Sequence, residues 1–579
     1  MTVYYTDRGT VTLEQRHYKA KGGQKAVFGK GGRGYAVYHE LDQMIAVGKL
    51  NELAALDRPE IIKPEPPILF LDKAKRKPIG HTFAWVDSVE PLVRLFPTGF
   101  QKKNGITPEM MIQMTQNLRD MVAYVHSKGI QIVDLNELNF LCDLAAWKLY
   151  AIDVNSYQTA NYPATAIMPN IFDRHCKRTS SGHPLFDEKT DWFSFGIIAF
   201  QMLVGLHPYK GGYAPMKKFP KNEQLNERMK QNISVFHSGV TVPAAARSFD
   251  LIPNALKQWM IAVFEQGERC PPPADFEAAI QIVRVAAKLL GSNLFEIEEI
   301  MEFDEEILDV ACHNTSRLVV LESKVWSSVT RQEHARPFPG ELKVGFTGKS
   351  NRPVAAYIEN GDLHLFDLIN QKEIRITAHA DSVMQCDGRL YIRIGTNINE
   401  LQLNEFSSKI VPTLKAAGQV VDVPNATEFY DGVIVQNVVG RHLISIFPEP
   451  GMCHQINLEE MDGYRIIDAK YENGVLMVVG EKGGSYNRLV CRFEKDFKSY
   501  DTRLIEDIDY TGLNFTVNNK GICVALVEDE KVEVFQAMKN SPTIKEMDDP
   551  AITGDMRLFH DGPNILFARG KKIHKMKMK

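Results

Sequence analysis

The segment Ser127–Asp143 reads SKGIQIVDLNELNFLCD, and it decides how the first half of this 579-residue chain is interpreted. Asp134 and Asn139 lie five residues apart in it, among apolar neighbours. One interpretation is a polar turn between two strands, since Asp and Asn side chains readily hydrogen-bond to their own backbone. The other is a phosphoryl-transfer site, in which carboxylate and amide oxygens hold Mg²⁺ and orient a substrate. The neighbouring segments bear on this choice.

The residues just before this segment predict an amphipathic helix. Ile106–Ile130 has apolar residues at helical spacing, with Thr107 as the cap, Pro108 in the first turn and Gly129 as the stop. The expected buried stripe consists of Met111, Met114, Leu118, Met121, Val122 and Val125. A buried helix therefore leads directly into the segment that carries Asp134.

Two β-rich pieces and a second helix follow in order. The β-rich pieces are IQIVDLNELNFLCD (130–143) and KLYAIDVNSYQ (148–158). The run FDEKTDWFSFGIIAFQMLVGLHPYKGG (186–212) begins with an acidic turn and continues as an apolar helix.

These pieces, in this order, resemble the C-terminal lobe of a protein kinase. The catalytic loop of that family reads H-R-D-L-x-x-x-N, with the Asp five residues before the Asn, and Ile132–Asn139 stands in its place. The metal-binding D-F-G resembles Asp153–Asn155, and D-x-W-S-x-G resembles Asp191–Gly196, with GLHPYKG after it. More closely, the segments are similar to a divergent group of bacterial kinase-like proteins with relatives in phages. That group reads D-L-N-E-x-N, then I-D-x-D-S-F/Y-Q, then an F-G-rich helix and H-P-F/Y. The resemblance covers roughly residues 15–290.

The resemblance implies ATP and Mg²⁺ as cofactors and a role for each polar residue. Asp134 is the implied catalytic residue, which orients a substrate hydroxyl and accepts its proton. Asn139 and Asp153 are the implied metal ligands, since Mg²⁺ prefers hard oxygen atoms. Asp191 is expected to brace the backbone of the catalytic loop. Taken alone, each of these residues also fits an Asx turn or a helix cap.

Several positions depart from the family pattern. Val133 replaces the Arg that would bind an activation-loop phosphate, so that form of control is not expected. Asn136 replaces a catalytic-loop Lys that contacts the γ-phosphate, and Asn155 stands at the Gly of D-F-G. IMPN (167–170) stands where A-P-E would be, which leaves Arg269 without its usual Glu partner.

The N-terminal segment admits two registers. In the first, Gly29–Gly34 is a G-x-G-x-x-G loop and Ala46–Lys49 imitates the V-A-I-K strand, but too few residues then remain for the next helix. In the second, Ala20–Phe28 forms the first hairpin, with the Gly29–Gly34 stretch as its turn, and Tyr35–His39 is the third strand. The helix is then Leu41–Leu56.

On the second register the third strand has no Lys, and Lys25 in GGQKAVF is the substitute. With-no-lysine kinases have a similar G-S-F-K-x-V-Y, and the resemblance implies that Lys25 reaches the phosphates and meets Glu52. A solvated strand Lys in an inactive kinase-like protein is the alternative. Lys49 is explained by i,i+3 pairing with Glu52 on one helix. The strand Pro78–Asp87 would lead to the adenine. The implied nucleotide-binding set is Gly22, Gly23, Lys25, Val27, Glu52 and Trp85.

The chain changes character near residue 290, after which short β-like runs alternate with turns. The turn signals recur about every 40 residues, at Asn314, Asn351, Asp387, Asp431, Asn473, Asn519 and Asp561. This period, with about four strands per repeat, predicts a β-propeller of about seven blades. Two stacked β-sandwiches are the alternative. The last repeat stops two strands after its turn, and the segment Leu294–Phe303 is expected to supply the missing outer strand and close the ring.

The expected organisation is therefore a multidomain α+β protein kinase-like bilobal fold followed by an all-β propeller. The boundaries are a kinase-like domain over residues 1–290, with lobes of about 15–87 and 88–290, a linker over 291–303 and the propeller over 304–579.

Composition excludes several classes of protein. The chain has 68 Lys and Arg against 72 Asp and Glu, so its net charge of −4 gives no general attraction to nucleic acid. The basic end RGKKIHKMKMK has period two and fits an edge strand with a solvated Lys face better than a nucleic-acid-binding tail. The eight Cys residues form no C-x-x-C pair, which favours free thiols over a zinc site or disulfides. The polar N-terminus and the absence of an 18-residue apolar run predict a cytoplasmic protein, or one within a virion if it is phage-encoded.

Two functions remain open from the sequence. The first is an ATP- and Mg²⁺-dependent serine/threonine protein kinase whose propeller binds a protein partner or substrate. The second is an inactive pseudokinase joined to a propeller, which acts as a structural or interaction protein in a larger assembly such as a phage particle. The set of Asp134, Asn139 and Asp153 favours the first, and the missing strand Lys, Asn136 and the missing A-P-E Glu favour the second.

Overall fold

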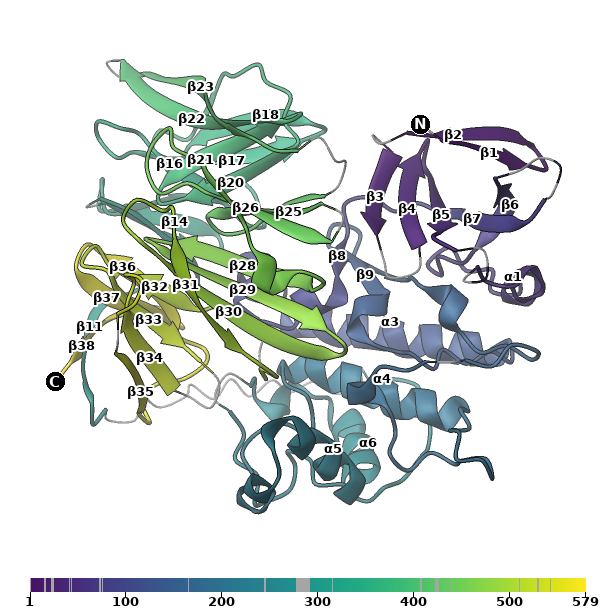
Figure 1. Cartoon of the computed structure of the whole chain (residues 1–579). Coiled ribbons are helices and arrows are strands. Elements are labelled where there is room, and N and C mark those ends of the chain that lie inside the picture. The colour runs from purple at the N-terminus through teal and green to yellow at the C-terminus, as the bar shows by residue number, and fades with distance from the viewer. Residues whose placement is uncertain are drawn as a thin grey trace.

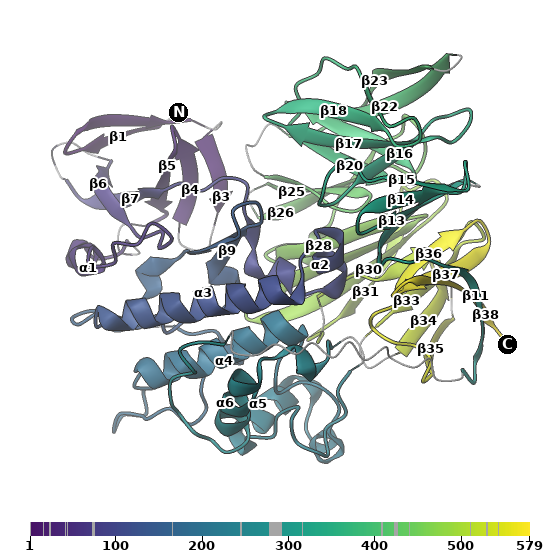
Figure 2. The same ribbon diagram turned by 180° about the vertical axis from the view of Figure 1, so that it is seen from behind.

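The computed structural model describes residues 2–579 apart from residues 15–16, 22–24, 41, 43, 72–73, 75, 165, 244–245, 277–291, 315, 407–408, 422–425, 439, 510, 528–530 and 542. Its described residues form six α-helices and are otherwise dominated by β-strands. Figures 1 and 2 show a first half (residues 2–276), with one sheet above helix α3 (Pro108–Ser127) and helices α4 (Glu188–Val204), α5 (Lys221–Gln231) and α6 (Asn254–Phe264) below it. A second half of stacked four-stranded sheets (residues 295–579, the seven-sheet region) lies beside it.

The first half begins with one antiparallel sheet of seven strands in the order β2-β1-β6-β7-β5-β4-β3. The predicted third strand is present as β5, and Gly31 and Gly32 in the turn before it have φ values of +59° and +70°. The helix expected over Leu41–Leu56 is shorter, since α1 spans only Val47–Leu53. The strands are β1 Thr2–Thr6, β2 Gly9–Leu13, β3 Tyr18–Lys21, β4 Lys25–Lys30, β5 Arg33–Tyr38, β6 Glu65–Phe70 and β7 Pro78–Ala84.

The predicted amphipathic helix is confirmed as α3, Pro108–Ser127. The Thr107 hydroxyl accepts a hydrogen bond from Met110 N, and every residue of the expected apolar stripe is buried. The second predicted helix is α4, Glu188–Val204, which is buried almost throughout and begins with a capping box between Asp187 and Thr190. The other elements of this half are β8 Glu90–Pro91, α2 Thr98–Lys103, β9 Phe140–Asp143, β10 Lys148–Ala151, α5 Lys221–Gln231 and α6 Asn254–Phe264.

Seven antiparallel four-stranded sheets make up the seven-sheet region and suggest the predicted propeller. The first sheet contains β12 Ile307–His313, β13 Ser316–Leu321, β14 Lys324–Ser327 and β15 Gln332–Ala335. The second contains β16 Lys343–Phe346, β17 Pro353–Glu359, β18 Asp362–Asp367 and β19 Lys372–Ile374. The third contains β20 Ser382–Cys386, β21 Arg389–Ile394, β22 Asn397–Phe406 and β23 Lys409–Gln419. The fourth sheet contains β24 Thr427–Phe429, β25 Val433–Val438, β26 Arg441–Ile446 and β27 His454–Asn457. The fifth contains β28 Arg465–Glu472, β29 Val475–Lys482, β30 Ser485–Phe493 and β31 Tyr500–Ile505. The sixth contains β32 Phe515–Val517, β33 Ile522–Leu526, β34 Lys531–Gln536 and β35 Ile544–Asp548.

The last sheet combines both ends of the region. It contains β36 Arg557–Asp561, β37 Asn564–Arg569 and β38 Lys572–Met578, and its fourth strand is β11, Phe295–Glu302. β11 pairs with β38 from Phe295 opposite Met578 to Glu302 opposite Lys572. The expectation that the segment near Leu294–Phe303 supplies the missing outer strand is therefore confirmed.

The seven sheets pack on one another in a closed series. Each sheet shares buried apolar side chains with the next one along the chain. The last sheet packs on the first, where Phe559 and Ile573 meet Ile307 and Val319 in one cluster. A central cavity of about 130 Å³ is lined by residues of β12, β28, β36 and several turns. Such closure gives each of the seven described sheets a neighbour on both faces.

The two halves share one hydrophobic core. Ile467, Val479, Tyr486 and Ile508 of the seven-sheet region belong to the same buried cluster as α3 and α4. At the edge of this contact, Arg94 forms an ion pair with Asp468 at 2.7 Å. The seven-sheet region is thus packed on the first half and is not merely tethered to it.

Helix α2 adds a polar contact at the centre of the ring. Lys103, its last residue, lies at the central cavity, 3.2 Å from Glu341 Oε1 and 3.8 Å from Asp431 Oδ2. These carboxylates raise the pKa of Lys103 against the effect of burial.

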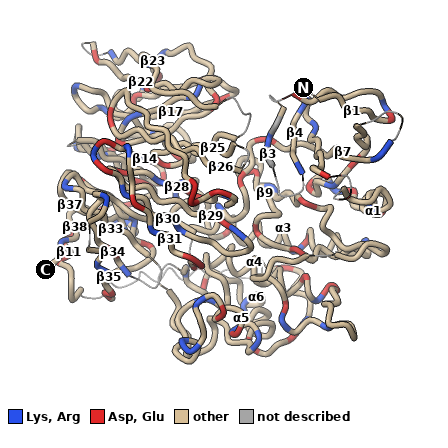
Figure 3. The backbone as a smooth tube through the Cα atoms, viewed as in Figure 1, with Lys and Arg blue, Asp and Glu red and all other residues tan. Residues whose placement is uncertain are grey.

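Charged side chains are distributed over both halves, and Figure 3 shows Lys and Arg interspersed with Asp and Glu along the chain. Among the described residues, no helix is both long enough and apolar enough to cross a membrane.

Candidate functional site

Asp191 holds the segment that carries Asp134. Its fully buried carboxylate accepts hydrogen bonds from Ile132 N at 2.7 Å, Val133 N at 2.8 Å and His126 Nε2 at 2.9 Å. Val133 has a φ of +64°, which is costly for a β-branched residue. The two backbone hydrogen bonds to Asp191 fix this conformation. The expectation that Asp191 braces this loop is confirmed.

Asp134 lies in a closely packed environment. Its Oδ1 accepts a hydrogen bond from Met168 N at 2.8 Å, and its Oδ2 lies 3.4 Å from the donor Asn139 Nδ2. Asn139 Nδ2 also donates to the backbone oxygen of Asp134 at 2.9 Å. Burial raises the pKa of the Asp134 carboxyl above its ordinary value. A carboxylate with a raised pKa is a better proton acceptor than an exposed one.

Lys25 extends from β4 to Asp153, the second predicted metal ligand. Its Nζ lies 2.8 Å from Asp153 Oδ1 and 2.9 Å from Asn155 Oδ1. The expected contact with Glu52 is not formed, because Glu52 Oε1 accepts a hydrogen bond from Asn161 Nδ2 at 2.7 Å instead. The ordinary charge attraction between an ammonium and the nearest carboxylate explains the change of partner.

Lys49 is a member of this cluster that the sequence did not reveal. Its Nζ donates to the backbone oxygen of Asn155 at 2.8 Å, so its side chain reaches the site, and pairing with Glu52 alone does not account for it. The residue is only 8% exposed, and burial lowers the pKa of its ammonium. Two lysines thus converge on the segment Asp153–Asn155.

The remaining predicted nucleotide-binding residues lie on or near the first sheet. Val27 pairs with Ala36, so both lie on the face of the sheet that carries Lys25. Trp85 follows β7, and the ammonium of Lys19 lies 5.3 Å from its ring centroid. Gly22 and Gly23 lie outside the described residues. The structure therefore brings Lys25, Asp153 and Asn155 together, with Asp134 and Asn139 in the adjacent loop, where the backbone N–H of Ile152 donates to Asn139 O at 2.9 Å. Glu52 does not contact Lys25 and binds Asn161.

Arg269 has a partner that the sequence analysis missed. Its guanidinium binds the carboxylate of Asp173 through two hydrogen bonds, Nε to Oδ2 at 2.6 Å and Nη2 to Oδ1 at 2.8 Å. Asp173 is 3% exposed and lies three residues after Asn170, the end of the IMPN segment. Arg269 is thus without the usual Glu partner, as expected, and Asp173, a few residues after the IMPN segment, pairs with it instead.

Replacing Asp173 by Ala should destabilise the protein by about 3 kcal/mol, because the change leaves the Arg269 guanidinium buried without its partner. Urea unfolding of the full chain measures this loss. Asp250→Ala is the matched control, because the carboxylate of Asp250 is 68% exposed and its ion pair with Lys257 contributes little. Equal losses in the two variants would contradict the prediction.

The side-chain oxygen atoms of Asn139 and Asp153 are compatible with a magnesium ion bound together with a nucleotide. Asn139 uses its Nδ2 as a donor to Asp134, which leaves its carbonyl oxygen as the atom suited to a metal. Asp153 supplies a carboxylate, one oxygen of which contacts Lys25. The described residues contain no cluster of three or more His, Cys, Asp or Glu side chains that would hold a metal by themselves. Mg²⁺ commonly uses one or two protein oxygens together with phosphate oxygens.

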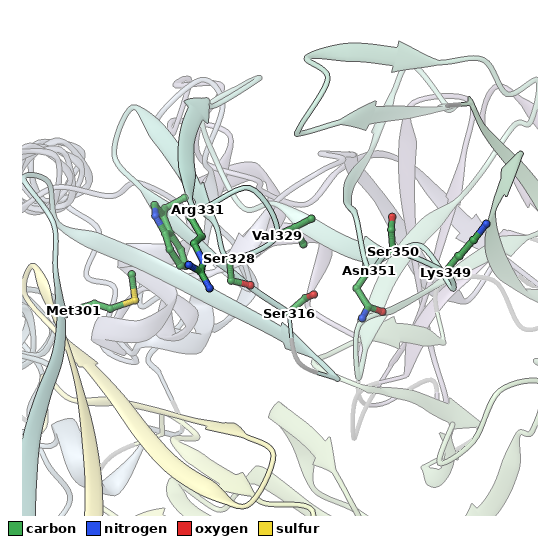
Figure 4. Close-up of a pocket in the computed structure, with 9 residues that line it drawn as sticks. Met301, Ser316, Ser328, Val329, Arg331, Lys349, Ser350 and Asn351 are labelled. Carbon is green, nitrogen blue, oxygen red and sulfur yellow. The ribbon is translucent and has the colours of Figure 1, made fainter. Parts of the chain in front are cut away.

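Two further hollows lie outside this cluster. A cavity of about 370 Å³ lies between the two halves and is lined by residues from α4, α5, Pro169–Asn170 and Gly483–Tyr486. An open hollow of about 570 Å³ lies on the seven-sheet region. Figure 4 shows Met301, Ser328 and Arg331 on one side of it and Lys349, Ser350 and Asn351 on the other.

Comparisons with known proteins give only weak similarities. No protein-family model matches the chain, and no curated protein matches it. Three solved structures are similar to parts of it. Hydrazine synthase of Kuenenia stuttgartiensis has 10% identity and a TM-score of 0.31, over 48% of this chain and 97% of that one. The kinase PK-1 of Cydia pomonella granulovirus has 12% identity and a TM-score of 0.30, over 43% and 88%.

The third is Hsv2 of Kluyvelomyces marxianus, with 11% identity and a TM-score of 0.29, over 46% and 89%. Similarities at this level assign neither a fold nor a function.

Proposed function

We propose that the first half is a protein kinase-like nucleotide-binding unit and that the seven-sheet region is a seven-bladed propeller that binds a protein partner. The observation that carries the proposal is the arrangement around two loops. Lys25 from the first sheet contacts Asp153, while Asp191 fixes the backbone beside Asp134. These residues come from segments far apart in the chain, which is unusual for turn or capping residues.

The topology of the first half supports this assignment. Five strands run β3-β4-β5-β7-β6 across the sheet, with α1 between β5 and β6 in the chain. This is the order expected when Tyr35–His39 is taken as the third strand and Val47–Leu53 as the helix after it. The closed series of seven sheets, joined through β11, supports the propeller in the same way.

In the proposed reaction, a hydroxyl of the acceptor attacks the γ-phosphate of ATP, and ADP leaves. Asp134 orients the hydroxyl and accepts its proton, for which its raised pKa is suited. Lys25 and Lys49 supply positive charge beside the phosphates. Asn139 and Asp153 would hold Mg²⁺, which neutralises phosphate charge when it is bound.

The pseudokinase alternative is favoured by one specific observation. Both carboxylate oxygens of Asp134 face hydrogen-bond donors of the protein itself, Met168 N and Asn139 Nδ2. Asn136 also turns to its own backbone, since its side-chain oxygen accepts from Leu138 N at 2.9 Å. A protein of this kind would bind nucleotide and use the propeller as an interaction module, without turnover.

Asp153→Asn should reduce the affinity for Mg²⁺–ATP by about tenfold or more, because it removes the one carboxylate that we assign to the metal. The affinity for ATP without Mg²⁺ should be retained, since Lys25 and Lys49 remain. Thermal shift and titration calorimetry of the full chain with ATP, with and without Mg²⁺, measure both quantities.

The matched control is Asp57→Asn, at a carboxylate that is 72% exposed. Loss of ATP binding both with and without Mg²⁺ would remove Asp153 from a metal role. Absence of any ATP binding by the wild type would overturn the proposed function, and incorporation of labelled γ-phosphate would separate the kinase from the pseudokinase.

A further inference from the structure

The segments on both sides of Asp134 contact the same hairpin of the seven-sheet region. The hairpin joins β29 and β30 through Gly483 and Gly484. On one side of Asp134, Tyr486 of the hairpin donates its phenolic hydrogen bond to the carboxylate of Glu137. Glu137 is fully buried, three residues after Asp134. Arg465 of the neighbouring strand β28 adds a hydrogen bond from Nη1 to the backbone oxygen of Leu138 at 3.4 Å.

On the other side, the turn of the hairpin lies against Met168 and Pro169. A Cβ atom at Gly484 would lie 2.9 Å from Met168 Cγ and 3.2 Å from Pro169 Cδ, so only glycine allows this approach. The backbone N–H of the same Met168 donates to Asp134 Oδ1. The hairpin and Pro169–Asn170 also line one cavity between the halves.

We propose that the β29–β30 hairpin is a built-in cover that restricts the approach of a polypeptide acceptor to Asp134. It contacts the turn Glu137–Asn139 and the Met168–Pro169 segment at once, and these are the segments that flank Asp134. Lys25 of the first sheet contacts Asp153 instead. Transfer to an external protein then requires the hairpin to move. The catalytic meaning of the cover rests on the proposed function, but the contact itself does not.

Met168 N–H reports on this contact directly, because it is hydrogen-bonded to Asp134. The test is amide hydrogen exchange of the full chain without nucleotide, for Gly484→Ala against Gly483→Ala. Both glycines have positive φ, +86° and +63°, so both changes strain the turn similarly. Only the Cβ at position 484 meets Met168, since nothing lies within 4 Å of a Cβ at position 483.

We expect exchange of the peptide containing Met168 to rise by about tenfold or more in Gly484→Ala and to change much less in Gly483→Ala. Exchange in α3 should be unchanged in both. If Gly484→Ala does not fold, Tyr486→Phe replaces it, since this variant removes only the hydroxyl that binds Glu137. Exchange should then rise in the peptide containing Glu137. Equal exchange in the two glycine variants, or no rise in Tyr486→Phe, would overturn the proposed cover.

A second arm measures phosphorylation of a Ser/Thr peptide library. Gly484→Ala should phosphorylate the library several-fold faster than Gly483→Ala, with equal ATP affinity in both. Equal rates, zero included, would overturn the restriction of transfer by the hairpin. Failure of the proposed function itself is distinguished from this result, because it appears as absence of ATP binding in the wild type.

Discussion

For the proposed kinase, replacing Lys25 by Ala should slow phosphoryl transfer by about 10²- to 10³-fold, the loss expected when a charged donor aimed at the developing transition state is removed. The Lys25 ammonium is 2.8 Å from Asp153 and makes a second hydrogen bond to Asn155, so its position is fixed by the protein itself. Incorporation of labelled γ-phosphate into a Ser/Thr peptide library measures the rate. Lys30→Ala is the matched control, since Lys30 lies on the same strand and its Nζ donates to Thr12 O, away from Asp153.

A lysine returned to the third strand should partly restore the rate. Ala36 is 1% exposed, and it pairs with Val27 on the face of the sheet that carries Lys25. The double variant Lys25→Ala with Ala36→Lys places an ammonium on the same face from the neighbouring strand. A rate for the double variant no higher than that of Lys25→Ala would contradict the idea that Lys25 replaces a strand lysine. A normal rate in Lys25→Ala itself would remove this residue from the site.

Much of the fold follows from periodicity, which a single sequence displays directly. The helical spacing of apolar residues predicted α3 with its cap Thr107, and the acidic turn at Asp187 predicted the start of α4. The recurring turns predicted a repeat of four strands, and the incomplete last repeat predicted the pairing of β11 with β38. Such features are local, or they follow from the need to close a sheet edge.

The side-chain partners were predicted less well, because they depend on where distant segments meet. Lys25 was expected to meet Glu52, but Asp153 lies closer, and Glu52 binds Asn161. The partner of Arg269 is an Asp that no family motif marks. Nothing in the spacing of residues connects Glu137 with Tyr486, which are far apart in the sequence. A departure from a motif is therefore weak evidence of lost chemistry until the new partner is known.

The same reasoning applies to the choice between a kinase and a pseudokinase. From the sequence, Asn136 suggested a lost γ-phosphate contact and Val133 the absence of control by an activation-loop phosphate, yet each has a structural role in the loop. Asn136 caps the turn at Leu138, and Val133 adopts its positive φ through the hydrogen bond to Asp191. Specific hydrogen bonds thus fix the conformation of the loop around Asp134. Stored backbone strain of this kind is typical of functional sites, which favours a working nucleotide site over a relic.

Replacing Asp191 by Ala should destabilise the first half by about 3–5 kcal/mol, the cost of breaking a fully buried and hydrogen-bonded carboxylate network. Three donors, Ile132 N, Val133 N and His126 Nε2, lose their acceptor at once. Val133 also loses the hydrogen bond that holds it at a φ of +64°. The loop that carries Asp134 should relax, and the proposed phosphoryl transfer should be lost even where the variant remains folded. Urea unfolding followed by tryptophan fluorescence measures the stability.

The matched control for Asp191 is Asp187→Ala on the same helix. Asp187 caps α4 through Lys189 N and Thr190 N, and loss of such a cap costs about 1 kcal/mol. A second comparison adds Val133→Gly to Asp191→Ala. Glycine adopts positive φ without strain, so it should restore part of the lost stability if strain in the loop is a real component. If Asp191→Ala loses no more stability than Asp187→Ala, the brace is dispensable. If Val133→Gly restores no stability to Asp191→Ala, the cost lies in the unpaired donors alone.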